Sequence, residues 1–185
     1  MKNTIVISAF PGLGKTTFFN KCKESNISVL DSDSINFSWL EGGTDRDGSN
    51  ATRVRNPDFP NNYIEHIREN IGKVDIILVS SHKVVRDALN AEGIKYFVVY
   101  PNISLKEKYI ERYIKRGSPE NFVEMMHTNF ESFVSELDNE IQIFQTKIKI
   151  NESGIYLSDI IFKIQNTILE DKIKYWKENQ TNQTK

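Results

Sequence analysis

Cysteine is nearly absent from the sequence, because Cys22 is the only one in the chain. A single cysteine cannot form a disulfide within the chain, and a buried free thiol fits a reducing compartment. Histidine is also scarce, and His66 and His127 have no partners at the spacing of zinc ligands. The sequence therefore predicts neither a disulfide framework nor a zinc site built from the protein alone.

Long apolar runs and an excess of charge of one sign are missing as well. No stretch approaches the roughly 20 apolar residues of a membrane-spanning helix, and the apolar run at residues 4–8 is too short for a signal peptide. Lys and Arg number 24 against 25 Asp and Glu, so no net positive field exists to attract nucleic acid or an anionic membrane. We therefore expect a cytoplasmic protein with a small-molecule partner. The sequence leaves the oligomeric state open.

The chain of 185 residues is long enough for one substantial core, which we expect in a single domain over residues 1–176, before a polar tail at 177–185. Short segments rich in β-branched residues predict five strands, and segments with helical apolar spacing lie between them. The predicted strands are 4–8, 27–31, 75–80, 95–100 and 146–150. The predicted helices are 15–24 and about 63–71, 84–89, 105–114, 119–141 and 156–176. This alternation predicts an α/β fold, a three-layer sandwich with a five-stranded parallel sheet.

A glycine-rich turn follows the first predicted strand. Residues 9–16, AFPGLGKT, match the phosphate-binding pattern G-x-x-x-x-G-K-[ST], except that Ala9 replaces the first glycine. This exception is tolerable if Ala9 needs no positive φ angle. An ordinary glycine-rich turn is the simpler interpretation, but the strand, the spacing, the lysine and the threonine together favour a phosphate site.

The composition of this turn suits a nucleoside triphosphate. Backbone N–H groups can converge on the β-phosphate, and the positive end of the following helix attracts negative charge. The expected nucleotide contacts are Gly12, Leu13, Gly14, Lys15, Thr16 and Thr17. Lys15 can bridge the β- and γ-phosphates, the Thr16 hydroxyl can ligate Mg²⁺, and Thr17 can bind the α-phosphate. The expected cofactors are therefore ATP and Mg²⁺.

Two aspartates, Asp31 and Asp33, follow the second predicted strand. In a parallel sheet they would lie on the same side as the glycine turn, near the γ-phosphate. Asp31 could organise Mg²⁺, and Asp33 could accept a proton from an attacking hydroxyl or orient the acceptor. The alternative is that Asp33 or Ser34 only caps a helix. The third strand ends in serines and a histidine instead of an acid, which weakens the interpretation as an ATPase motor.

Three stretches together resemble the small P-loop kinases, the superfamily of nucleoside monophosphate kinases, shikimate kinase and dephospho-coenzyme A kinase. They are AFPGLGKTT, the D-x-D of DSDS, and LKEKYIERYIKRG, which looks like the arginine-bearing entry to the kinase lid. The order of strands and helices agrees over about residues 1–175. The resemblance implies a fold of the P-loop kinase type, with a lid at about 112–122.

The resemblance also implies roles for arginines. In those kinases a lid arginine contacts the transferring phosphoryl group, which makes Arg112 and Arg116 catalytic candidates, although two arginines on a helix are most often solvated surface. The acceptor site of those kinases lies between the second and third strands, around a loop that here spans about 40–60. Its cationic candidates are Arg53, Arg55 and Arg86, which suit an acceptor that already carries a phosphate.

Further candidates line the same regions. Trp39 could stack on a base and His82 could contact the substrate, although plain packing and a structural histidine are the alternatives. By chain order, the loop after the fifth strand borders the adenine in the small kinases. This places Ile155 or Tyr156 against the ring.

The sequence thus predicts an enzyme that transfers the γ-phosphoryl group of ATP to a small acceptor, with a (deoxy)nucleoside monophosphate as the first choice. One alternative is transfer to a hydroxyl of a nucleoside or another metabolite, with Asp33 as the base. A non-catalytic module that senses ATP is another. The neutral charge balance disfavours a polynucleotide kinase.

Overall fold

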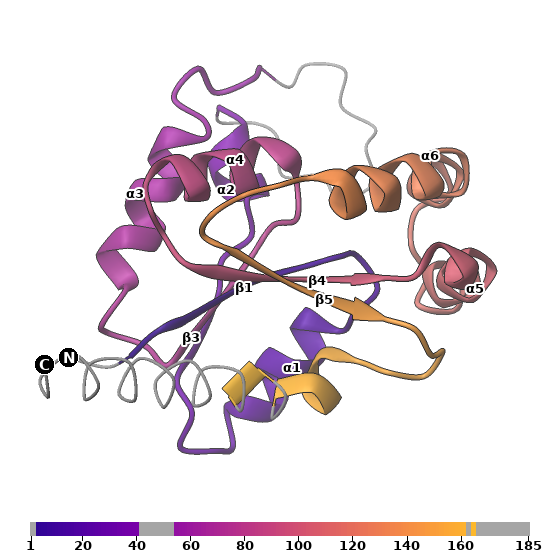
Figure 1. Ribbon diagram of the computed structural model, residues 1–185, viewed down its shortest axis with the longest axis horizontal. Coiled ribbons are helices and arrows are strands. Elements are labelled where there is room, and N and C mark those ends of the chain that lie inside the picture. Colours follow the sequence, from indigo (N-terminus) through magenta and orange to yellow (C-terminus); the bar gives the residue numbers. More distant parts are fainter. Residues whose placement is uncertain (1–2, 41–53, 162–163, 166–185) are drawn as a thin grey trace, which may run out of the picture.

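In a computed structural model that describes residues 3–40, 54–161 and 164–165, five parallel strands form one sheet in the order β2-β3-β1-β4-β5 (Figure 1). The strands are β1 (Ile5–Ala9), β2 (Val29–Asp31), β3 (Ile76–Val79), β4 (Tyr96–Pro101) and β5 (Gln145–Ile150). β1 lies in the centre, where Ile7 is in register with Leu78 on one side and Phe97 on the other. The predicted five-stranded parallel sheet is confirmed.

Helices cover both faces of the sheet and complete the three layers. They are α1 (Lys15–Cys22), α2 (Ile35–Ser38), α3 (Asn61–Asn70), α4 (Lys83–Ala91), the 3-10 turn η1 (Ile103–Leu105), α5 (Lys106–Lys115) and α6 (Glu120–Asn139). Figure 1 shows α3, α4 and α6 along one face, and α1 with the helical segment that starts at Leu157 along the other. Each strand after β1 is thus reached by a crossover, as parallel pairing requires.

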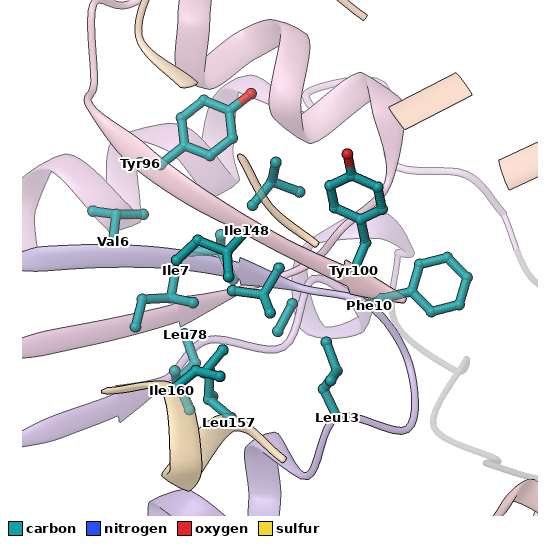
Figure 2. Close-up of a cluster of buried hydrophobic side chains, with 14 of the residues drawn as sticks. Val6, Ile7, Phe10, Leu13, Leu78, Tyr96, Tyr100, Ile148, Leu157 and Ile160 are labelled. Atoms are coloured by element: carbon teal, nitrogen blue, oxygen red, sulfur yellow. The ribbon is translucent and has the colours of Figure 1, made fainter. Parts of the chain in front are cut away.

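The core fills both sides of the sheet, because the central strands carry apolar side chains in both directions. Ile7, Leu78 and Val98 are fully buried, and each such side chain contributes about 1.5–3 kcal/mol of hydrophobic stabilisation. Figure 2 shows Tyr96 and Tyr100 on one side of the strands and Leu157 and Ile160 on the other. Burial on two faces explains why these strands read as continuous apolar runs instead of alternating patterns.

Two predicted features fall wholly or partly outside the part of the chain that the structure describes. They are residues 41–53 of the loop at 40–60, and the C-terminal stretch that contains most of the helix predicted at 156–176 and all of the tail at 177–185. Among the helices that the structure does describe, none combines the length and the apolar character needed to cross a bilayer.

Candidate functional site

A cavity of about 760 Å³ lies where β1, β2 and β3 end. Four segments and two further side chains line it. They are residues 10–17 of the glycine turn and the start of α1, residues 31–34 at the end of β2 and after it, residues 80–82 after β3, Arg112, Lys115 and Arg116 of the α5 region, Phe122 and Tyr156. Ligands of doubly wound α/β proteins bind at this carboxyl edge of the sheet.

The glycine turn has a backbone that side chains would disrupt. Gly12 and Gly14 have φ angles of 86° and 82°, in the left-handed region that favours glycine. A Cβ atom on Gly12 would lie 2.9 Å from Cε1 of the buried Tyr113. Ala9 ends β1, and outside glycine no residue in the described ranges has a positive φ, so alanine fits where the phosphate-binding pattern has its first glycine.

Lys15 is the first residue of α1 and lines the cavity. Its Nζ donates a hydrogen bond of 2.8 Å to the carbonyl of Ala9. Burial lowers the pKa of Lys15, while the charges of Asp31 and Asp33 act in the opposite direction. Burial also raises the pKa of Asp31, which the Lys15 charge counteracts. One cation and two carboxylates therefore share this end of the cavity.

The segment after β2 is fastened to the end of β3 by Tyr63 of α3. The buried Tyr63 hydroxyl donates to the Ser32 carbonyl over 2.5 Å and accepts from the backbone N–H of Ser80 over 3.3 Å. The Ser32 N–H donates to the carbonyl of Leu78. Asp33 accepts from the backbone N–H of Ile35 over 3.0 Å, so the helix-capping alternative describes a contact that Asp33 does make. The same aspartate also lines the cavity.

Arg112 and Arg116 of the predicted lid both line the cavity, each against aromatic rings. The Arg112 guanidinium lies 4.5 Å from the ring centroid of Tyr109 and 4.4 Å from that of Tyr156, and it donates to the Gly12 carbonyl over 3.3 Å. The side chain of Arg116, just after α5, lies 5.0 Å from the Tyr113 ring centroid. Cation–π contacts of this kind hold a planar guanidinium in a defined orientation.

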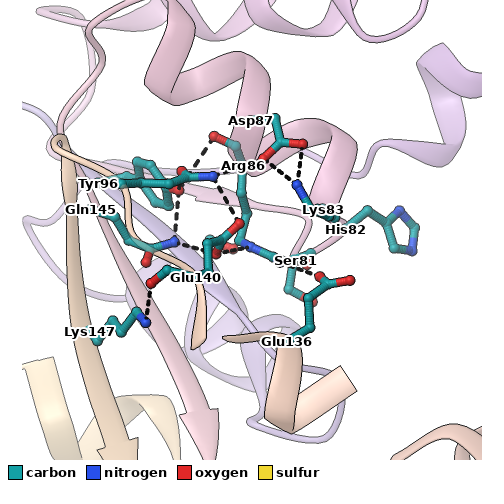
Figure 3. A network of polar contacts seen from close by, with 12 residues as sticks. Ser81, His82, Lys83, Arg86, Asp87, Tyr96, Glu136, Glu140, Gln145 and Lys147 are labelled. Carbon is teal, nitrogen blue, oxygen red and sulfur yellow. Dashed lines mark hydrogen bonds and ion pairs between the residues drawn. The ribbon is translucent and has the colours of Figure 1, made fainter. Parts of the chain in front are cut away.

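Arg86 does not line the cavity, which differs from the role predicted for it. It is only 2% exposed, and its Nε and Nη2 donate to Glu140 and Glu136 of the α6 region over 2.9 and 2.6 Å (Figure 3). Its Nη1 donates to the Ser81 carbonyl. The guanidinium that was expected to bind an acceptor phosphate is thus occupied by two carboxylates of the protein itself.

The other predicted acceptor residues lie at the edge of the site or outside it. Arg55 pairs with Trp39 in an isolated antiparallel bridge, and its guanidinium lies 4.8 Å from the Trp39 ring centroid. Neither residue lines the cavity, and Arg53 lies outside the described residues. His82 lines the cavity, where desolvation and the charge of Lys15 lower the pKa of its ring.

The structure places the two residues that were predicted at the adenine side, Ile155 and Tyr156, in different surroundings. Tyr156 lines the cavity above Gly14, whereas Ile155 packs against the hydrophobic core. Several lining residues were not predicted: Phe10, Pro11, Ser32, Ser34, Ser80, Ser81, Lys115 and Phe122. The serine pair at the end of β3 carried a usable signal, because polar residues at the carboxyl end of a parallel strand face a ligand crevice.

The donor set fits Mg²⁺ held jointly with a ligand better than a protein-only metal site. Thr16 and Asp31 both line the cavity and provide oxygen atoms. In the described ranges, no group of three or more His, Cys, Asp or Glu side chains could hold a metal ion. Mg²⁺ usually takes few protein ligands and fills its octahedron with phosphate oxygens and water.

Comparison with known proteins supports the fold. No family model and no curated protein matches the chain. The tunicamycin resistance protein of Deinococcus radiodurans is similar in structure, with a TM-score of 0.57 and 16% identity over 91% of this chain and 96% of that chain. An uncharacterized protein from Eubacterium ventriosum aligns with a TM-score of 0.41 and 15% identity over 90% of this chain and 99% of that chain. The first likeness and the strand order show a P-loop kinase-like α/β fold.

Proposed function

We propose that the protein transfers the γ-phosphoryl group of ATP, bound with Mg²⁺, to a small-molecule acceptor. The observation that carries this proposal is the meeting of three sets of residues in one cavity. These are the glycine turn with Lys15, the carboxylates of Asp31 and Asp33, and the arginines of the α5 region. Phosphoryl transfer depends on positioning and on charge neutralisation, and this cavity offers both.

Each set has a distinct role in the proposed reaction. The backbone of the turn and Lys15 bind the β- and γ-phosphates, and Arg112 and Arg116 neutralise charge that develops on the transferred group. Thr16 and Asp31 would hold Mg²⁺, which would shield the phosphate charges from one another. Tyr156 forms an aromatic wall of the nucleotide site.

Two acceptor classes are compatible with this mechanism. A (deoxy)nucleoside monophosphate is the class that the arginines between the second and third strands favoured. A hydroxyl of an uncharged metabolite is the second candidate, and the enclosure of Arg86 by Glu136 and Glu140 favours it. In that case Asp33 accepts the proton of the attacking hydroxyl.

Product analysis tests the proposal. The protein is incubated with ATP, Mg²⁺ and a panel of nucleosides, monophosphates and sugars, and the products are separated. A phosphorylated acceptor supports a kinase, ADP alone indicates an ATPase, and ATP binding without turnover indicates a sensor. Lys15→Ala should abolish transfer, whereas Lys21→Ala, at an exposed position on the same helix, should not. Equal product yields from Lys15→Ala and the parent protein would refute the role of Lys15.

A further inference from the structure

Two neighbouring residues of α5 each donate a hydrogen bond to the backbone of the glycine turn. The Tyr113 hydroxyl donates to the Pro11 carbonyl over 2.9 Å. The Arg112 guanidinium donates to the Gly12 carbonyl over 3.3 Å. The partners lie 102 and 100 positions apart in the chain, so these bonds join α5 directly to the turn.

The other carbonyl groups between Ala9 and Gly14 accept hydrogen bonds as well. The donors are Lys15 Nζ to Ala9 and the backbone N–H groups of Leu13 to Phe10, of Leu157 to Leu13 and of Phe18 to Gly14. By contrast, the N–H groups of Gly12 and Gly14 have no hydrogen-bond partner within the ranges that the structure describes. The protein thus satisfies the oxygens of the turn and leaves these two donors for a ligand.

Tyr113 acts on the peptide unit that contains one of these donors. The Pro11 carbonyl and the Gly12 N–H belong to the same peptide unit, which is planar and trans, so they point in opposite directions. The hydrogen bond from Tyr113 to that carbonyl therefore directs the Gly12 N–H away from Tyr113. Gly12 lines the cavity and Tyr113 does not, so an N–H directed away from Tyr113 is placed to meet a ligand.

The Tyr113 side chain is held firmly enough to define this direction. It is completely buried, and its ring packs edge-on against the rings of Tyr109 and Phe122, with centroid distances of 6.3 and 5.3 Å. A Cβ atom on Gly12 would lie 2.9 Å from Cε1 of this ring, so the ring packs directly against the turn. Burial raises the pKa of Tyr113, which keeps the hydroxyl protonated and able to donate at neutral pH.

A buried tyrosine hydroxyl needs a hydrogen-bond partner wherever it lies, so the simpler explanation is a bond that only stabilises the fold. Tyr100 is such a case, because it is 3% exposed, donates to Asp138 over 2.9 Å and does not line the cavity. The acceptor distinguishes Tyr113 from Tyr100. Tyr113 binds a peptide unit of the phosphate-binding turn, whereas Tyr100 binds a side chain of α6.

We propose that Tyr113 is a positioning residue for nucleotide binding. Its hydroxyl fixes the peptide unit between Pro11 and Gly12, so that the Gly12 N–H donates to the phosphate chain of the nucleotide. This inference rests on the proposed function and adds a residue outside the cavity on which nucleotide affinity depends. The helix that carries Arg112 thereby also sets the geometry of the turn.

The first experiment removes the Tyr113 hydroxyl and keeps the ring. Equilibrium binding of ATP with Mg²⁺ is measured to the full-length protein, and Tyr113→Phe should raise the Kd about fivefold, the effect of one neutral hydrogen bond. The KM for ATP should rise by the same factor, with kcat unchanged. Tyr100→Phe is the matched control, with a lower melting temperature and the parental Kd. A parental Kd in Tyr113→Phe overturns the inference.

The second experiment tests whether the effect lies at the phosphates. The same proteins are titrated with inorganic tripolyphosphate and Mg²⁺, which offer the turn a phosphate chain without a base or a sugar. Tyr113→Phe should weaken this binding by the same factor as it weakens ATP binding. An unchanged affinity for tripolyphosphate contradicts the inference. So does a parent protein that binds no tripolyphosphate at millimolar concentration, because the turn then does not bind phosphates by itself.

The two proposals fail in different ways. If Tyr113→Phe weakens binding of ATP and tripolyphosphate but no acceptor is phosphorylated, phosphoryl transfer is wrong and the role of Tyr113 stands. If product forms and Tyr113→Phe binds ATP as the parent does, phosphoryl transfer stands and the role of Tyr113 is wrong. Binding and turnover are therefore both measured on the same preparation.

Discussion

Arg86 Nε lies 2.9 Å from Glu140 Oε2, and both side chains are almost completely buried, with 2% and 6% exposure. The pair joins α4 to the segment that follows α6, and the same guanidinium donates to the Ser81 carbonyl at the cavity wall. Arg86 thus contacts a residue that lines the cavity but does not line the cavity itself. Its charge has a structural role and is not directed at a ligand.

Removal of this guanidinium should destabilise the fold. Arg86→Ala leaves a buried Glu140 carboxylate without its charge partner, which typically costs about 3–5 kcal/mol of unfolding free energy. Urea denaturation followed by circular dichroism measures the loss. Lys83→Ala is the control, since its pair with Asp87 is half-exposed and should contribute only about 0.2–1 kcal/mol. If Arg86→Ala kept the parental stability but lost acceptor binding, the structural role would be contradicted and the predicted contact of Arg86 with the substrate would be supported.

A second prediction concerns the backbone of the glycine turn. Gly12→Ala forces an L-residue into a φ of 86° and brings its Cβ against the buried Tyr113 ring. The φ angle alone costs about 1–2 kcal/mol, so the turn should shift. Nucleotide affinity should then fall at least about tenfold. Isothermal titration with ATP and Mg²⁺ measures it. Gly117→Ala has a φ of 72° with no atom within 4 Å of its Cβ, so it carries the strain without the contact. Parental ATP affinity in Gly12→Ala would contradict this account of the turn.

Tyr63 provides a prediction with a defined pH range. Burial raises its pKa from 10.0 to about 12, so the folded state holds the phenol proton more tightly than the unfolded state does. The stabilisation linked to this proton is complete below pH 10 and is lost as the pH rises from about 10 to about 12. Tyr63→Phe should lack this part of the alkaline loss.

Tyr63→Phe also distinguishes the loss of hydrogen bonds, which acts at neutral pH, from the pH-dependent loss of stability. At neutral pH, Tyr63→Phe should be less stable by about 1–3 kcal/mol, because the Ser32 carbonyl and the Ser80 N–H each lose a hydrogen-bond partner. Denaturation curves of both proteins at pH 7 and across the alkaline range provide the comparison. Identical alkaline slopes for the two proteins would assign the pH dependence to other groups.

The fold followed from sequence because its signals are local. A buried strand such as residues 76–79 is a short apolar run, and parallel strands that follow one another in the chain are joined by crossovers. The glycine turn was equally predictable, since its glycines, Lys15 and Thr16 are adjacent in the chain. Its exception at Ala9 was resolved by the structure, where this residue ends β1 and has no positive φ angle.

The fates of individual polar side chains did not follow from sequence. Arg86 meets partners 50 and 54 positions away, and no pattern around it indicates that Glu136 and Glu140 will enclose it. Ser32 reads as one of many serines, and only the structure shows that its buried hydroxyl has no hydrogen-bond partner among the described residues. Such properties depend on tertiary packing, which composition and spacing do not encode locally.

We expect substitutions of Arg112 and Arg116 to affect different kinetic constants. Arg116 is exposed and contacts Ser118 and two aromatic rings, so its guanidinium is available for a phosphoryl group. Arg116→Ala should reduce kcat about 100-fold, the usual effect of losing one transition-state donor, with little change in the KM for ATP. Steady-state kinetics with the acceptor found by product analysis measures both constants.

Arg112 is held differently, and its conservative variant is the informative one. Arg112→Lys keeps the positive charge but lacks the planar group that lies between the Tyr109 and Tyr156 rings and donates to the Gly12 carbonyl. If Arg112 orders the glycine turn, this variant should raise the KM for ATP several-fold, and Arg116→Lys should not. If charge alone matters at Arg112, Arg112→Lys will keep the parental KM for ATP. The guanidinium between the two rings would then contribute to packing in the predicted lid and would not order the glycine turn for nucleotide binding.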